Sequence, residues 1–281
     1  MVDMNSMLYW YPRIKDLDIP QPRTRIYMLP DWFNPFELAA CIAGEKDGFD
    51  CKTLWSRVRQ ANEELDRLAN EIGYPLFARS DQTSCKHHIV DGEPLYLIKR
   101  PMDFSKLWMA AVECHELIPA RIVNPPAPKA FVLREWLDIE TWTTLPGKLS
   151  AYPYNRVEVR LFAKNGEVYS GFPYYHISGL LARLEMWGMP GSVIEKVRKD
   201  YKQYVHAVID DLPTLVQHAS KATGKLGGDW SVDFAKSKQY GWTLIDMAVA
   251  EDSYFPDPED MVDLDQVFLD KLHETVRGRK T

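Results

Sequence analysis

The spacing of apolar and polar positions predicts two long helices. Between Leu54 and Ile72, apolar residues recur at helical intervals with charged residues between them, and Gly73 follows as a typical helix terminator. A second amphipathic helix is predicted over residues 194–219, with a break near Pro213 because proline removes a backbone donor. A shorter helix is expected to close the tail of the chain.

Short runs rich in apolar and β-branched residues predict strands, several of them joined as hairpins. Asn165-Gly166 is a typical tight turn between two such runs. Because hairpins are prominent and helices lie between them, the pattern favours an α+β fold over a purely parallel sheet. The predicted strands cover residues 23–29, 74–79, 130–136, 156–163, 167–171, 231–235 and 242–247.

A proline-rich stretch over residues 124–128 predicts the division of the chain. Its three prolines cannot continue a helix or a central strand. We therefore expect an N-terminal lobe over residues 1–125 and a C-terminal lobe over residues 126–281.

Composition narrows the class of protein. Of the 281 residues, 46% are hydrophobic and 26% are charged, which is typical of a globular chain. The net charge of -6 provides no overall attraction to nucleic acid. The sequence has no uncharged apolar run of about 18 residues, so no membrane-spanning helix is predicted. The first residues lack the pattern of a secretory signal. Four cysteines without zinc-type spacing are expected as free thiols in a cytoplasmic protein: Cys41, Cys51, Cys85 and Cys114.

The last predicted hairpin has one carboxylate in each strand, Asp233 and Asp246, flanked by apolar residues. If the strands pair, the two acids approach one another and repel unless a cation neutralises them. Mg²⁺ suits such a pair, because it takes one or two protein carboxylates and fills its other positions with phosphate oxygens and water. An ordinary solvated hairpin is the alternative.

A small polar loop follows the strand at 74–79. Its backbone N–H groups and hydroxyls, Ser80 among them, are suited to binding phosphates between the fixed charges of Arg79 and Lys86. The loop lacks the glycines of a Walker motif, and a plain surface turn is the alternative.

The end of the strand at 130–136 suggests a nucleotide hinge. Its backbone is suited to meeting an adenine edge, and Asp138 or Glu140 to accepting from ribose hydroxyls. An edge strand with a polar end is the alternative. The hinge residues expected to contact the nucleotide are Glu135, Trp136, Leu137, Asp138 and Glu140.

Glu158 and Arg160 are two positions apart in a predicted strand, so they lie on the same face. A solvated charge pair is the default interpretation. If this face lines a cleft, Arg160 is suited to binding a triphosphate.

Four features resemble the ATP-grasp superfamily in their order along the chain, over roughly residues 72–253. They are the polar loop, the hinge, the strand with Glu158 and Arg160, and the last hairpin. The resemblance is closest to the cell-division-cycle 123 assembly-factor family, through the hinge at 132–138, the Glu-x-Arg strand at 158–162 and the strand at 244–247. It implies two α+β lobes clasping ATP, with a phosphate-covering loop in the first lobe, and the adenine hinge and metal-binding hairpin in the second.

The resemblance also implies roles for individual residues. Arg79 and Arg160 would bind phosphate, and Asp233 and Asp246 would hold Mg²⁺. The family has asparagine two residues after the second acid, where this chain has Ala248. Glu251 or Asp252 would then supply the missing oxygen, or metal binding would be weaker.

Three functions remain open at this point. The first is an ATP-dependent carboxylate–amine ligase that acts through an acyl-phosphate, in which Arg160 and Lys86 serve the phosphoryl transfer. The second is a nucleotide-binding assembly factor without ligase turnover, and the third is a degenerate fold that does not bind ATP. Besides the nucleotide, the expected partner is a small-molecule or protein acceptor that the sequence does not identify. Neither a membrane nor nucleic acid is expected as a partner.

Overall fold

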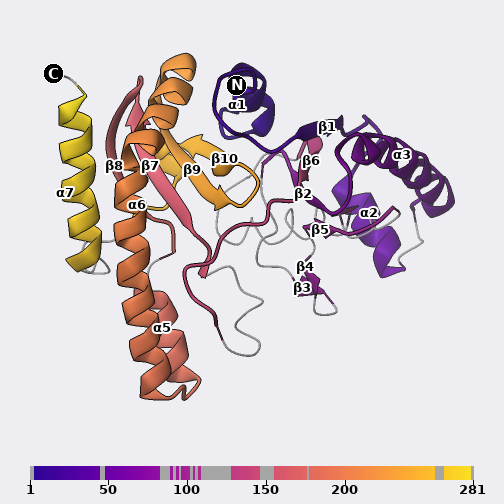
Figure 1. Cartoon of the computed structure of the whole chain (residues 1–281). Helices are drawn as coiled ribbons and strands as arrows, with labels where there is room; N and C mark the ends of the chain where they lie inside the picture. The colour runs from indigo at the N-terminus through magenta and orange to yellow at the C-terminus, as the bar shows by residue number, and fades with distance from the viewer. Residues whose placement is uncertain are drawn as a thin grey trace. The chain divides into compact units, whose positions relative to one another are not determined.

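The computed structural model describes residues 3–44, 48–82, 89–90, 93–94, 96–101, 104, 107–108, 128–145, 155–175, 177–256 and 263–279 (Figure 1). Contacts divide the chain into a small unit, Pro22–Trp136, and a large unit, which combines Met1–Gln21 with Leu137–Thr281. The expected boundary between residues 125 and 126 lies outside the described residues, as do residues 124–127 of the proline-rich stretch. Helices and antiparallel sheets in both units make the fold α+β, as the pattern predicted.

The small unit contains a four-stranded antiparallel sheet in the order β1-β6-β2-β5. Its strands and helices are β1 (Thr24–Met28), α2 (Pro35–Ala43), α3 (Cys51–Ile72), β2 (Leu76–Ser80), β5 (Leu97–Ile98) and β6 (Ala130–Glu135), with the short pair β3 (Ile89–Val90) and β4 (Glu93–Pro94). The predicted helix and three of the predicted strands are thereby confirmed.

One face of this sheet is apolar, because α3 packs its buried stripe against it. Phe131 and Leu133 of β6 and Leu76 and Ala78 of β2 belong to the same core cluster as that stripe. Gly73 has φ +98° and its N–H donates to Ala69 O at 2.8 Å, so the predicted glycine ends the helix. The side chains that alternate with this apolar set lie on the opposite face.

The prediction of free thiols is wrong for Cys41 and Cys51, which form a disulfide. Cys41 lies in the last turns of α2 and Cys51 is the first residue of α3, so the connection between the helices brings their Cα atoms to 5.6 Å. Sequence spacing alone did not indicate this approach. Cys85 and Cys114 lie outside the described residues.

The large unit contains a second four-stranded antiparallel sheet, in the order β10-β9-β7-β8. Its elements are α1 (Met7–Ile14), β7 (Glu158–Lys164), β8 (Glu167–Pro173), α5 (Ile177–Met186), α6 (Gly191–Leu226), β9 (Asp229–Ser237), β10 (Gly241–Val249), the 3-10 turn η4 (Ala250–Asp252) and α7 (Asp263–Gly278). Both predicted hairpins are confirmed. Asn165 and Gly166 have φ of 51° and 89° in the first of them, as their turn type requires.

Helix α6 covers one face of this sheet, and α7 lies beside it (Figure 1). The predicted break near Pro213 is wrong, because α6 is one helix of 36 residues that continues through Pro213. Buried residues on both sides of the proline, including Leu212 and Leu215, keep the helix packed. This packing outweighs the cost of about 3 kcal/mol that an internal proline imposes.

The first residues of the chain also pack on the large unit. The ring of Tyr9 in α1 stacks on Trp230 with centroids 6.0 Å apart. Leu244 N donates to Pro20 O at 2.9 Å, and Val249 N donates to the side chain of Asn5 at 2.7 Å. Two backbone N–H groups on the outer edge of β10 thereby have hydrogen-bond acceptors. Among the described residues, none of the helices has the length and apolar character needed to span a bilayer.

Candidate functional site

Three predicted site residues form one row across the sheet of the large unit. Arg160 of β7 pairs with Asp233 of β9, and Asp233 pairs with Asp246 of β10, each in direct cross-strand register. The residues that alternate with this row, such as Val232 and Phe234, are buried on the α6 side, where His218 of α6 contacts the Phe234 ring. The row therefore lies on the face that α6 does not cover.

A β-bulge at Ile245 puts Asp246 into this row. Leu244 pairs with Phe234, but Asp246 pairs with Asp233, so Ile245 is the extra residue of the hairpin. With regular alternation, Leu244 and Asp246 would share a face and the carboxylate would lie on the apolar α6 side. The bulge instead gives Leu244 to the core and Asp246 to the charged face.

Arg160 is held from several sides. Its Nε and Nη2 donate to Asp233 at 2.7 and 2.8 Å, and its Nη1 donates to Tyr254 O at 3.2 Å. The guanidinium also lies 4.8 Å from the ring centroid of Tyr174. Burial alone would lower the pKa of Arg160, but the charge and hydrogen bonds of Asp233, with Asp246 contributing, raise it above its ordinary value. The side chain is therefore a permanent cation.

Three carboxylates lie on this face beside the guanidinium of Arg160, those of Glu158, Asp233 and Asp246. Glu158 is 2% exposed, on the same strand face as Arg160, as predicted. The described residues contain no group of three metal-ligating side chains that would form a complete protein cage. The pair Asp233 and Asp246 instead suits a cation that takes one or two carboxylates and shares the rest of its coordination with a ligand.

Ala248 lies two positions after Asp246 and pairs with Ser231. The Ser231 hydroxyl contacts the Ser253 hydroxyl at 2.6 Å, so two hydroxyls that the sequence did not single out lie beside this position. Asp252, suggested as a substitute oxygen, accepts from Asn5 Nδ2 at 2.7 Å, and Glu251 is exposed in η4.

In the small unit, Arg79 lies at the end of β2 and is 5% exposed. Its guanidinium donates to Ser80 O at 3.1 Å and to Gln82 O at 3.5 Å, so the side chain is turned towards its own loop. The Ser80 hydroxyl accepts from Gln82 N at 3.3 Å. Lys86, the other predicted cation of the loop, lies outside the described residues.

Arg134 is a buried cation that the prediction of site residues missed. It pairs with Phe77, and Arg79 pairs with Val132, so Arg134 and Arg79 lie on the same face of the sheet, opposite the apolar core. Arg134 is 4% exposed. An arginine inside the apolar run 130–135 was the available signal, because a buried guanidinium needs a charged or polar partner.

The predicted hinge residues have varied surroundings. Glu135 forms an ion pair with Arg23 at 3.3 Å, and Trp136 stacks on Tyr96 at 6.3 Å. These four residues belong to the small unit.

The remaining hinge residues belong to the large unit. Leu137 O accepts from Ile139 N at 3.1 Å. Asp138 binds Lys238 of the β9–β10 turn at 2.8 Å. Glu140 is held through its backbone, since its N–H donates to Lys236 O at 2.8 Å, and its side chain lines a pocket under α6. The hinge is thus a main-chain connection whose side chains point to different partners.

No family model matches the chain, and no curated protein matches it. Solved structures similar to this chain include Cdc123 from Schizosaccharomyces pombe, which is 16% identical, with 88% of this chain and 83% of that chain covered and a TM-score of 0.47. A RimK domain protein, ATP-grasp, from Sphaerobacter thermophilus is 13% identical over 98% of this chain and 66% of that chain, with a TM-score of 0.39.

A third similar structure is N5-carboxyaminoimidazole synthase from Aspergillus clavatus, in complex with ADP and 5-aminoimidazole ribonucleotide. It is 10% identical over 87% of this chain and 44% of that chain, with a TM-score of 0.39. The superfamily and the family that the sequence resembles are thus both among the similar solved structures.

Proposed function

We propose that this protein binds Mg-ATP, with the metal at Asp246 and Asp233 and the phosphates at Arg160. The observation that carries the proposal is the single row of Arg160, Asp233 and Asp246 across three adjacent strands. A row of this kind combines the two needs of a metal–triphosphate complex, carboxylates for the cation and a permanent cation for the phosphates.

Asp233 serves both needs in this proposal. Two of its acceptor positions are used by Arg160, and an ionised carboxylate has about four, so it retains capacity for a metal ligand bond. Asp246 is the half-buried member of the pair and is the primary ligand. The bound cation would neutralise the repulsion between these two directly opposed carboxylates.

Arg79 of the small unit stays a predicted phosphate contact, and it shares one sheet face with the buried Arg134. Ser80, Glu135 and Lys86 stay predicted nucleotide contacts, as do Trp136, Leu137 and Asp138 for adenine and ribose. Glu140 is not part of the proposed nucleotide site, because its side chain lines a pocket on the other face of the large sheet.

For the reaction, we propose an ATP-dependent ligase in which a substrate carboxylate receives the γ-phosphoryl group and a nucleophile then displaces the phosphate. The chain's own residues would hold the reactants: Arg160, oriented by Asp233, binds the phosphoryl oxygens, and Lys86 is the predicted second cation. Bound Mg²⁺ would neutralise charge on the triphosphate.

A nucleotide-binding assembly factor is the second candidate, and Ala248 favours it. An asparagine there would add an oxygen beside Asp246, whereas alanine offers none. Binding of ATP tolerates this loss better than catalysis does, because catalysis depends on a well-fixed metal.

The test is calorimetric titration of ATP with and without Mg²⁺ on the natural protein, on Asp246→Asn and on the matched control Asp210→Asn. Asp210 is exposed on α6, away from the row. We expect Asp246→Asn to weaken Mg-ATP binding by about tenfold or more, as loss of a metal-supporting residue does, and the control to bind normally. Equal affinities of all three would overturn the site.

A phosphate-release assay with Mg-ATP and a pool of amino acids and peptides then separates the two functions. Turnover that depends on an added acceptor supports the ligase. Tight ATP binding without turnover, together with a specific co-purifying protein, supports the assembly factor.

A further inference from the structure

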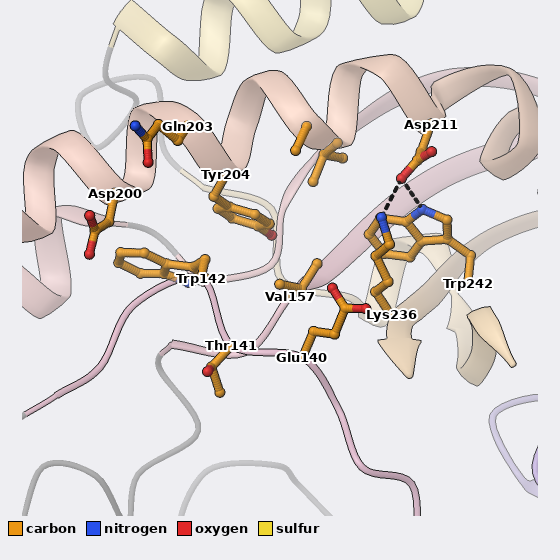
Figure 2. Close-up of a pocket in the computed structure, with 12 residues that line it drawn as sticks. Glu140, Thr141, Trp142, Val157, Asp200, Gln203, Tyr204, Asp211, Lys236 and Trp242 are labelled. Carbon is orange, nitrogen blue, oxygen red and sulfur yellow. Dashed lines mark hydrogen bonds and ion pairs between the residues drawn. The ribbon is translucent and has the colours of Figure 1, made fainter. Parts of the chain in front are cut away.

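The large unit contains a pocket on the face of its sheet opposite the Arg160 row. It lies between α6, the segment 140–142 and the ends of β9 and β10, and its volume is about 240 Å³ (Figure 2). Pockets for drug-sized ligands have about 300–1,000 Å³, so this one suits a single side chain or a small molecule.

Aromatic rings form its walls. Trp142 and Tyr204 stack with an interplanar angle of 11° and centroids 5.8 Å apart, and they lie side by side in Figure 2. Trp242 lines the pocket with them, and Val157 and Val208 add apolar surface. Such walls suit a hydrocarbon stem or the face-on approach of a cation.

Three carboxylates line the same space. Asp211 Oδ2 accepts from Lys236 Nζ and from Trp242 Nε1, both at 2.8 Å (Figure 2). Asp200 Oδ2 accepts from the Thr143 hydroxyl at 2.6 Å and from Lys196. Each of these acids has its second oxygen without a hydrogen-bond partner among the described residues.

Glu140 is the third acid, and its carboxylate has neither an ion pair nor a hydrogen bond within the described part of the chain. Lys196 and Lys236 balance Asp200 and Asp211, so the lining retains one net negative charge, at Glu140. An anionic ligand would meet three carboxylates. A neutral apolar ligand would give no hydrogen-bond donor to half-buried Glu140, whose charge otherwise acts on the exposed Lys238.

We propose that this pocket binds an alkylammonium or alkylguanidinium group, with the charged end at Glu140 and the hydrocarbon stem along Trp142 and Tyr204. A free amine and the lysine or arginine side chain of a peptide share this chemistry. Because the pocket is on the α6 side, its occupation does not require the Arg160 row, and the inference is independent of ATP binding.

The test is calorimetric titration of the full chain with n-butylguanidine, n-butylamine and the neutral control n-butanol. Glycine- and serine-flanked peptides with one arginine, one lysine or one citrulline form the second arm. We expect the cationic probes to bind and the neutral probes not to. Tighter binding of the charged peptides than of the free amines identifies a peptide side chain as the source, and the reverse identifies a small amine.

The variants are Glu140→Gln and the control Glu195→Gln, an exposed acid of α6. Loss of a charge-assisted hydrogen bond predicts that Glu140→Gln binds the cationic probes about ten- to a hundredfold more weakly. The control Glu195→Gln should bind them as the natural protein does. Asp246→Asn should bind the probes normally. The indole N–H resonance of Trp242, assigned with Trp242→Phe, should shift on binding in the natural protein. Three results would overturn the proposal. They are binding of butanol or the citrulline peptide as tight as that of the cations, an unchanged affinity of Glu140→Gln for the cations, and no binding of any cation.

Discussion

Arg160 and Asp233 form two parallel hydrogen bonds across directly opposed positions of β7 and β9, Nε to Oδ1 at 2.7 Å and Nη2 to Oδ2 at 2.8 Å. Only 9% of Arg160 and 3% of Asp233 is exposed. A buried bidentate pair of this kind is costly to break from one side, because the remaining charge is left without its partner. It also fixes the direction of the guanidinium that we assign to phosphate.

Replacing Arg160 by Met should therefore destabilise the protein by about 3–5 kcal/mol, measured by urea unfolding. The double variant Arg160→Met with Asp233→Leu should recover a large part of this loss, since it removes both charges. A double variant no more stable than the single one would show that the buried charge is not the source of the cost.

The bulge residue Ile245 is predicted to be dispensable for the position of Asp246. Deleting Ile245 makes Leu244 and Asp246 neighbours in the strand, so they lie on opposite faces and Asp246 stays opposite Asp233. We expect the deletion variant to retain the Mg²⁺ dependence of ATP binding in calorimetric titration, whereas Asp246→Asn weakens it. Loss of that dependence in the deletion variant would contradict the assigned register.

Gly171 of β8 allows β7 to approach closely at the site. A Cβ there would lie 2.5 Å from Leu161 Cδ2 and 2.8 Å from Arg160 O. Gly171→Ala should therefore cost about 1–3 kcal/mol in unfolding free energy, as overpacking does. Gly179→Ala in α5 is the control, because nothing lies within 4 Å of its Cβ, and it should be neutral or stabilising. Equal effects of the two substitutions would contradict the close approach.

His218 should make stability depend on pH. Burial, followed by the charge of Lys221, lowers the pKa of His218 below its ordinary 6.5, with Asp18 acting weakly the other way. Its Nδ1 is buried without a hydrogen-bond partner in the described structure. His218 therefore binds its proton more tightly in the unfolded chain than in the folded one. The folded state has its full stability with respect to this group above pH 6.5, and it loses stability as the pH falls towards the pKa of His218 in the folded protein.

Unfolding free energies measured from about pH 5 to pH 8, across the ordinary histidine pKa, should fall towards acid in the natural protein. His218→Gln should show a shallower fall. Identical slopes in the two proteins would mean that other groups account for the dependence.

Local patterns predicted most of the elements but not the relationships that build the site. Apolar periodicity and turn residues located α3, the two hairpins and the carboxylates of the last one. The bulge at Ile245 was not predictable, because Leu244 and Asp246 have the spacing of a regular strand. The register shift at the bulge arises from the pairing of β9 with β10, which the spacing within one strand does not show. This register decides on which face of the sheet a side chain lies.

The other differences have the same origin. Pro213 is tolerated because packing on both sides of it holds α6 together, and local propensity does not contain that packing. The Cys41–Cys51 disulfide depends on the approach of two helix ends. Arg134 became notable only when the strand register aligned it with Arg79 on one face.

The most direct test of the proposed site is a crystal structure with a non-hydrolysable ATP analogue and Mn²⁺ in place of Mg²⁺, read through the anomalous signal of the metal. We predict an anomalous peak at bonding distance from the carboxylate of Asp246, on the face that carries Asp233, with Arg160 contacting a phosphate oxygen. A peak elsewhere, or a nucleotide bound without contact to this row, would contradict the account.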